Sequence, residues 1–132
     1  MYYFTANEAN LILPDVIQKF KFALTKKNEV SKIEQRLQVI LSSTNNFEEY
    51  IPIKQKLNTA ITEFYKALEN LEKTGVMIKS IDQGLLDFPS KRFDEDVWLC
   101  WKYGETEIKF WHEKESGFMG RKPVEVSDES LV

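Results

Sequence analysis

Cysteine and histidine are nearly absent from this sequence of 132 residues, which contains one of each, Cys100 and His112. With a single cysteine no intramolecular disulfide can form, and a cysteine-based zinc site is excluded. Long apolar runs are missing too, so no segment reaches the roughly 20 residues of a transmembrane helix. Residues 1–5 lack a basic segment followed by an apolar stretch, so no secretory signal is visible. We therefore expect a cytoplasmic protein.

An excess of positive charge is also lacking, because the net charge is -3. A protein that binds nucleic acid non-specifically needs a basic face to displace counterions from the phosphates, so nucleic acid is not an expected partner. Hydrophobic residues make up 42% and charged residues 30%, which is ordinary for a folded globular domain. The length is that of one domain, and we expect residues 1–132 to form it.

The first half of the chain predicts two long helices. Thr5 and Glu8 fit a capping box, in which each side chain bonds the other residue's backbone N–H. Pro14 should break or kink the helix that starts there, because it lacks an N–H and clashes with the preceding turn. A short opening helix followed by a long helix from Pro14 to about Leu41 is therefore expected.

The second helix shows the clearer pattern, because its apolar residues recur at steps of three and four. These residues are Ile53, Leu57, Ala60, Phe64, Ala67 and Leu71. Asn46 with Glu49 fits a second capping box, although Pro52 could delay the regular helix. Gly75 should end the helix in the left-handed conformation. Two helices joined by a short polar loop pack antiparallel, so residues 5–75 predict a helical hairpin.

The far end of this hairpin should extend beyond any small sheet. The second helix spans roughly 30–35 Å at about 1.5 Å per residue, whereas a strand of average length spans about 17–20 Å. Apolar side chains at that end need another partner, and we expect them to form a homodimer interface. They are Val30, Ile33, Leu37, Leu57 and Ile61. The leading functional hypothesis is therefore a self-associating interaction or structural module, not an enzyme.

After Gly75 the apolar period changes to two, which predicts strands. Strands at residues 76–81 and 85–88 flank a three-residue hairpin loop that ends at Gly84. Residues 89–96 are expected to form a polar loop, and residues 97–103 and 106–112 a second hairpin around Gly104 and Glu105. The fold class is α+β: a long antiparallel helical hairpin (residues 5–75), a small antiparallel β-meander of three to four strands (residues 76–112), and an irregular C-terminal tail (residues 113–132).

The two-residue turn at Gly104 and Glu105 predicts a register for the second hairpin. It sets Trp98 opposite Trp111 and Val97 opposite His112, so that His112 and Cys100 face opposite sides of the sheet. The paired tryptophans would then need a cover. The tail could provide it, either within the chain or swapped between subunits.

Several motifs together resemble a known family. They are Thr5-Ala6-Asn7-Glu8-Ala9-Asn10, Asp82-Gln83-Gly84-Leu85-Leu86-Asp87-Phe88-Pro89-Ser90, Leu99-Cys100-Trp101, Gly104-Glu105, Phe110-Trp111-His112, and Gly117 with Gly120-Arg121-Lys122-Pro123-Val124. With them the chain resembles the prokaryotic family called domain of unknown function 2203. The resemblance covers essentially the whole chain. It implies a compact unit and brings no activity, cofactor or partner.

A second functional hypothesis is a site at the junction of sheet and tail. His112, Asp87 and Asp82 could bind a divalent metal, because one histidine with two carboxylates leaves positions open for water. Arg121 with the backbone at Gly117 and Gly120 could bind an anionic ligand. The protein would then be a metal- or small-ligand-binding domain, and such a site could serve a hydrolase.

Each of these residues also has a structural interpretation. His112 could be hydrogen-bonded at the sheet edge, Asp82 could stabilise its turn, and Asp87 could pair with an arginine that pins the tail. Cys100 is expected to be a small buried hydrophobe. A third hypothesis, stacking of single-stranded nucleic acid on Trp98 and Trp111, needs a basic surround that the composition does not supply.

Overall fold

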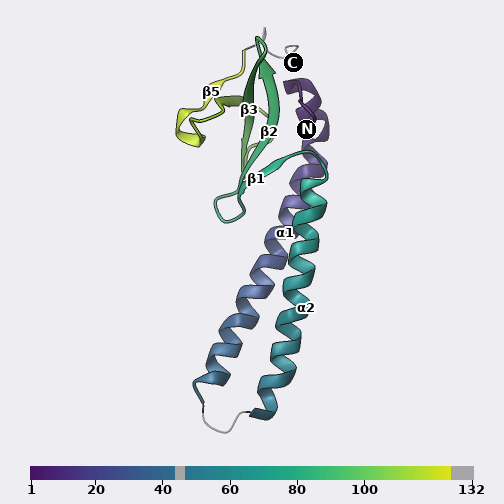
Figure 1. Ribbon diagram of the computed structural model, residues 1–132, viewed down its shortest axis with the longest axis vertical. Coiled ribbons are helices and arrows are strands. Elements are labelled where there is room, and N and C mark those ends of the chain that lie inside the picture. The colour runs from purple at the N-terminus through teal and green to yellow at the C-terminus, as the bar shows by residue number, and fades with distance from the viewer. Residues whose placement is uncertain (44–46, 126–132) are drawn as a thin grey trace.

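The structure, a computed structural model, describes residues 1–43 and 47–125. Helix α1 (Ala6–Leu41) and helix α2 (Phe47–Glu72) form an antiparallel hairpin, and an antiparallel sheet follows. In Figure 1 the sheet lies beside the end of the hairpin where α1 begins and α2 ends, while the other half of the hairpin extends away from it. The predicted α+β class and helical hairpin are confirmed. No helix in the described ranges combines the length and apolarity that crossing a membrane requires.

The sheet has five strands where three to four were expected. The strands are β1 (Met77–Ser80), β2 (Leu85–Arg92), β3 (Glu95–Lys102), β4 (Phe110–Glu113) and β5 (Lys122–Pro123), and they pair in sequence order. The additional strand comes from the segment after β4, which also forms the short 3-10 helix η1 (Phe118–Gly120). The tail, through residue 125, is therefore more regular than predicted, since β5 completes the edge of the sheet.

Helix α1 begins with the predicted capping box at Thr5 and Glu8. The separate opening helix expected before Pro14 is wrong, because α1 is continuous through this residue. Proline in a helix costs about 3 kcal/mol, but Leu13 and Val16 on either side of it are almost fully buried against the sheet. Their packing outweighs one lost hydrogen bond. Likewise Pro52 does not delay α2, which starts at Phe47; the cap expected at Asn46 lies outside the described residues.

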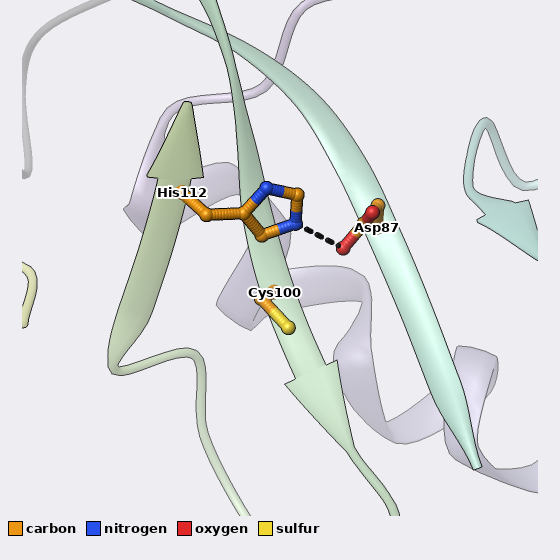
Figure 2. A group of neighbouring side chains, drawn as sticks. All are labelled: Asp87, Cys100 and His112. Atoms are coloured by element: carbon orange, nitrogen blue, oxygen red, sulfur yellow. Dashed lines mark hydrogen bonds and ion pairs between the residues drawn. The ribbon is translucent and has the colours of Figure 1, made fainter. Parts of the chain in front are cut away.

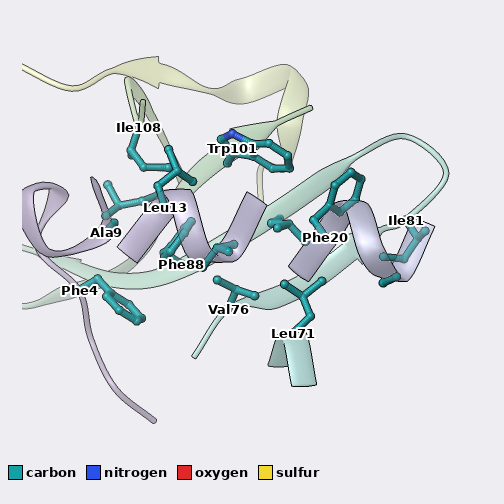
Figure 3. Packing of buried hydrophobic residues seen from close by; sticks show 14 of the residues in the cluster. Phe4, Ala9, Leu13, Phe20, Leu71, Val76, Ile81, Phe88, Trp101 and Ile108 are labelled. Atoms are coloured by element: carbon teal, nitrogen blue, oxygen red, sulfur yellow. The ribbon is translucent and has the colours of Figure 1, made fainter. Parts of the chain in front are cut away.

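The main core lies between the sheet and the adjoining half of the hairpin. Leu86, Phe88, Leu99 and Trp101 form the inner face of the sheet, and Leu13, Val16, Phe20 and Leu71 pack on them from the helices. Figure 3 shows Phe20 of α1 beside Trp101 and Leu71 of α2 beside Val76. A ring-to-ring distance of 5.3 Å between Phe20 and Trp101 confirms an edge-on contact.

A second, smaller core lies at the distal end of the hairpin, between the two helices. Leu37, Ile40, Ile53 and Leu57 are buried in it, and Val30, Ile33 and Ile61 pack against it partly exposed. Two of the residues expected at a dimer interface, Leu37 and Leu57, are therefore covered within the chain. The partly exposed Val30, Ile33 and Ile61 keep an outward surface, and the homodimer stays a prediction.

The loop expected over residues 89–96 is wrong, because β2 and β3 continue through it and meet at a tight turn. Phe93 and Asp94 have φ values of 50° and 66°, the left-handed pair that a type I′ hairpin turn requires. Pro89 fits in a strand because it lies beyond the reach of β1, which pairs with residues 85–87. There the segment before α1 takes its place: the Phe4 N–H donates to Pro89 O at 2.7 Å, and Ser90 Oγ donates to Phe4 O at 2.6 Å.

The register predicted for β3 and β4 is wrong by one residue. The structure pairs Cys100 with Phe110, Leu99 with Trp111, Trp98 with His112 and Val97 with Glu113. Residues 103–109 form a longer connection, because Trp101 Nε1 donates to Glu105 O at 2.8 Å and the Ile108 N–H donates to Asn10 Oδ1 at 2.6 Å. Trp111 consequently packs toward the helices, and His112 shares the opposite face of the sheet with Trp98 and Cys100. The two tryptophans do not oppose each other.

Candidate functional site

Three potential metal ligands meet on the outer face of the sheet, the face turned away from the helices. Asp87 of β2 pairs directly with Cys100 of β3, and His112 of β4 reaches toward Asp87 from the other side. Figure 2 shows the imidazole and the carboxylate meeting above the strand that carries Cys100. One ligand atom of each residue lies within 4.8 Å of the other two, and each residue is 2% exposed. No other such group occurs in residues 1–43 and 47–125.

Hydrogen bonds fix the orientation of the His112 ring. Its Nδ1 lies 2.9 Å from the backbone oxygen of Glu113, and its Nε2 lies 3.1 Å from Asp87 Oδ1. A carbonyl oxygen only accepts hydrogen bonds, so Nδ1 carries a hydrogen and donates it. In the neutral ring Nε2 then presents its lone pair to Asp87. One proton must lie between Nε2 and Oδ1, and it comes from an imidazolium or from a carboxylic acid.

Asp87 is unusual as a buried carboxyl group. Burial raises its pKa above the ordinary range, while the hydrogen bond and charge of His112, and then the charge of Lys79, oppose this. Lys79 Nζ lies 4.0 Å from Asp87 Oδ2 and 5.1 Å from the centre of the Trp98 ring. Oδ1 therefore faces the histidine, and Oδ2 faces a cation held against an aromatic face.

Cys100 contributes a protonated thiol. Burial raises the pKa of this thiol from 9.0 to about 12, and the negative charge of Asp87 adds to the effect. A thiol with such a pKa is a poor nucleophile at neutral pH, because the reactive species is the thiolate. A bound cation is the natural way to obtain the thiolate here, since a coordinating thiol loses its proton.

The group lies in the wall of a partly open cavity of about 270 Å³. Lys79 and Leu85 border it from the sheet, and Lys114, Gly117 and Phe118 border it from the segment after β4. The segment is held over the outer face by Arg121, whose guanidinium lies 3.8 Å from the centre of the Phe110 ring and pairs with Glu105. The tail thus covers Phe110 and borders the cavity, instead of covering a pair of tryptophans.

The residues predicted from the sequence fall into separate places. Asp87 and His112 come together, but Asp82 lies in the exposed turn between β1 and β2 and pairs with Lys27 of α1. Arg121 is occupied by Glu105, and only Gly117 of the predicted anion-binding glycines borders the cavity. Gly120 packs closely on Ser116.

Sequence reasoning missed two members of the site, Cys100 and Lys79. Cys100 was assigned to the face opposite His112 because of the register error. The exclusion of a cysteine-based zinc site was too broad, because a single cysteine rules out sites with several thiolates but not a mixed site with one. Alternation along β2 and β3 could have placed Asp87 and Cys100 on one face, since both strands were expected in that region. No sequence signal indicated Lys79.

The fold and the site together define an α+β domain whose sheet carries a buried Asp–Cys–His group beside an open cavity. The chain belongs to the family described as "Uncharacterized conserved protein (DUF2203)", whose family model matches residues 2–124. The family predicted from the sequence motifs is confirmed. No curated protein and no solved structure gives a significant match.

Proposed function

We propose that this protein binds a divalent transition-metal ion, with zinc the best fit, through His112 Nε2, Cys100 Sγ and the Asp87 carboxylate. The hydrogen bond from His112 Nδ1 to the Glu113 carbonyl carries the proposal. Histidines that bind metals nearly always donate their other ring N–H to a carbonyl or carboxylate, which fixes the tautomer and directs the lone pair at the ion. His112 has this arrangement, since Nδ1 faces the Glu113 carbonyl and Nε2 faces Asp87.

The spacing of the three groups suits such an ion. In a tetrahedral site with metal–ligand bonds of about 2.0–2.3 Å, the ligand atoms lie roughly 3.3–3.7 Å apart. The His112–Asp87 distance of 3.1 Å is close to this, and all three atoms lie within 4.8 Å of one another. Small side-chain rotations would close the remaining gap. The mixed nitrogen, sulfur and oxygen set favours zinc over magnesium or calcium, which prefer oxygen ligands alone.

Three protein ligands would leave a fourth position toward the cavity. Zinc sites with three protein ligands and one water are typical of catalysis, because the ion lowers the pKa of its bound water to about 7. Structural zinc sites, by contrast, use four protein ligands. If the protein is an enzyme, metal-assisted hydrolysis is therefore the reaction class that its residues support best.

Zinc titration of the metal-free protein, with competition by a chelating dye, tests the proposal. Wild type should bind one equivalent, whereas Cys100→Ser and Asp87→Asn, which preserve size, should each lose at least about tenfold in affinity. Asp82→Asn is the matched control, because it removes a carboxylate from the same hairpin outside the site. Circular dichroism confirms folding of each variant. Equal affinity of wild type and Cys100→Ser would contradict the proposal.

Self-association is a second candidate function, and a groove along the distal half of the hairpin favours it. Ile33, Ile53 and Ala60 form its apolar floor. Glu29 and Glu63 line one end and share Lys26 as a partner, whereas Arg36 and Lys56 line the other end. In an antiparallel dimer, the acidic end of each groove would face the basic end of the other. A two-fold interface requires such a self-complementary surface.

Light scattering at micromolar concentration tests this candidate. The wild type should be a dimer, and Arg36→Glu with Lys56→Glu should give monomers because both ends of each groove become acidic. Adding Glu29→Lys and Glu63→Lys to that variant reverses both ends and should restore the dimer. A monodisperse wild-type monomer would contradict the candidate.

A cytoplasmic location belongs to the same proposal. Cys100 is the only cysteine of the chain and has a free thiol. A thiolate ligand must stay reduced, and the cytoplasm maintains thiols in that form.

A further inference from the structure

We infer that the metal-loaded cavity binds a small oxyanion, with Lys79 as its charge partner. The inference rests on the proposed metal site and identifies the class of ligand that the site takes. It comes from the charges around the cavity and from the position of Lys79 beside Asp87.

A bound ion would change the net charge of the group beside Lys79. Lys79 Nζ lies 4.0 Å from Asp87 Oδ2, so the carboxylate is its charge partner. A divalent ion held by the Cys100 thiolate, the Asp87 carboxylate and the neutral His112 ring forms a group with no net charge. The carboxylate charge is then neutralised by the ion, and the positive charge of Lys79 at the cavity wall is left uncompensated.

The position of Lys79 keeps that charge at the cavity. Its ammonium group lies 5.1 Å from the centre of the Trp98 ring, and 43% of its side chain is exposed. A cation over an aromatic face is held in place without a compensating negative charge. Lys114 and Glu115 also border the cavity, and their charges cancel. The loaded cavity is therefore positive by about one charge, which favours an anion.

The size and walls of the cavity limit the anion. Its volume of about 270 Å³ lies just below the range of about 300–1,000 Å³ typical of sites for drug-sized ligands. Leu85 and Phe118 give it an apolar side. An oxyanion group, a carboxylate or a phosphate, with a small apolar body fits these walls, and one of its oxygens could occupy the open position of the ion.

The test uses the cobalt-loaded protein, because the visible spectrum of Co²⁺ responds to exchange of its water ligand. Inorganic phosphate and acetate are titrated separately. Either anion should change the spectrum with saturation, and the stronger of the two identifies the oxyanion class. Lys79→Met keeps the alkyl stem over Trp98 and removes the charge. It should weaken anion binding at least about tenfold while changing Co²⁺ affinity less than about threefold.

Lys91→Met is the matched control. Lys91 also lies over an aromatic ring, at 4.8 Å from the centre of Tyr3, and pairs with Asp96, but it does not border the cavity. Its substitution should leave anion binding unchanged. Unchanged anion affinity in Lys79→Met, or no spectral response to either anion in a protein that binds cobalt, would overturn the inference and leave the metal site standing. Absence of cobalt binding would overturn both.

Discussion

His112 Nε2 lies 3.1 Å from Asp87 Oδ1 although β3 separates the strands that carry the two residues. The contact spans β3 at the position of Cys100, which brings three metal-ligand types to one point. It depends on register, because a slip of one residue would turn His112 to the helix side of the sheet. Formation of the site therefore depends on the register of the strands as well as on the three residue types.

Alkylation of Cys100 should be very slow in the native, metal-free protein. Because the pKa of this thiol is raised from 9.0 to about 12, the fraction present as thiolate near pH 8 falls about a thousandfold relative to an unshifted thiol. Iodoacetamide labelling followed by mass spectrometry, with the protein unfolded in urea as reference, measures this. Equal rates in the native and unfolded states would show that the thiol is neither buried nor shifted.

Metal affinity should rise with pH. Below pH 12 the metal-free thiol holds its proton, and a thiol that coordinates a metal ion loses it. Binding releases this proton, so raising the pH favours the complex by about tenfold per unit. Zinc competition between about pH 6.5 and 8 should give a slope of about one proton in wild type and one fewer in Cys100→Ser. A flat profile would mean that the thiolate is not a ligand.

Asn10 should be needed for both stability and the site. Its Oδ1 accepts from the Ile108 N–H at 2.6 Å, and Asn10→Ala leaves that part-buried donor unpaired at a cost of about 1–3 kcal/mol. Urea denaturation measures the loss, and zinc affinity should also fall because Ile108 leads into β4. Asn7→Ala, an exposed position in the same turn of α1, is the control. If both variants behaved alike, Asn10 would not hold the register.

Substitutions in the turn between β2 and β3 should increase the stability of the protein. Phe93 adopts a positive φ of 50° and is 72% exposed, and a side chain in this conformation costs roughly 1–2 kcal/mol. Asn-Gly is the preferred pair for a type I′ turn. Replacing Phe93 with Asn and Asp94 with Gly should therefore raise the free energy of unfolding by about 1 kcal/mol, allowing for the lost contact of the Arg92 guanidinium with the Phe93 ring. A lower stability in thermal unfolding would contradict the assigned turn.

Helices were the predictable part of this fold. The apolar steps in α2, the capping box at Thr5 and the left-handed Gly75 are local signals, and all three are present in the structure. The prediction at Pro14 also relied on a local signal, the energetic cost of proline inside a helix. The burial of Leu13 and Val16 outweighs it, and that burial depends on a sheet more than 60 positions away along the chain.

Strand pairing was predictable only where glycine marked the turn. Gly84 has a φ of 68° between β1 and β2, as expected. Gly104 and Glu105 suggested an equally tight second hairpin, but Asn10 binds Ile108 from 98 positions away and draws the connection outward. This hydrogen bond joins residues far apart in the sequence, so no pattern among neighbouring residues predicts it. The same register error placed Cys100 and His112 on opposite faces of the sheet, so the site was not predicted from the sequence.

The most direct measurement is the near-ultraviolet and visible absorption spectrum of the metal-free protein during titration with Co²⁺ at neutral pH. Cys100 is the only cysteine, so a thiolate-to-cobalt charge-transfer band can come from no other residue. Cobalt bound by Cys100, Asp87 and His112 should give this band together with the strong visible absorption of a tetrahedral site, and both should saturate at one equivalent. Weak absorption typical of six-coordinate cobalt without a charge-transfer band would contradict a metal site at Asp87, Cys100 and His112.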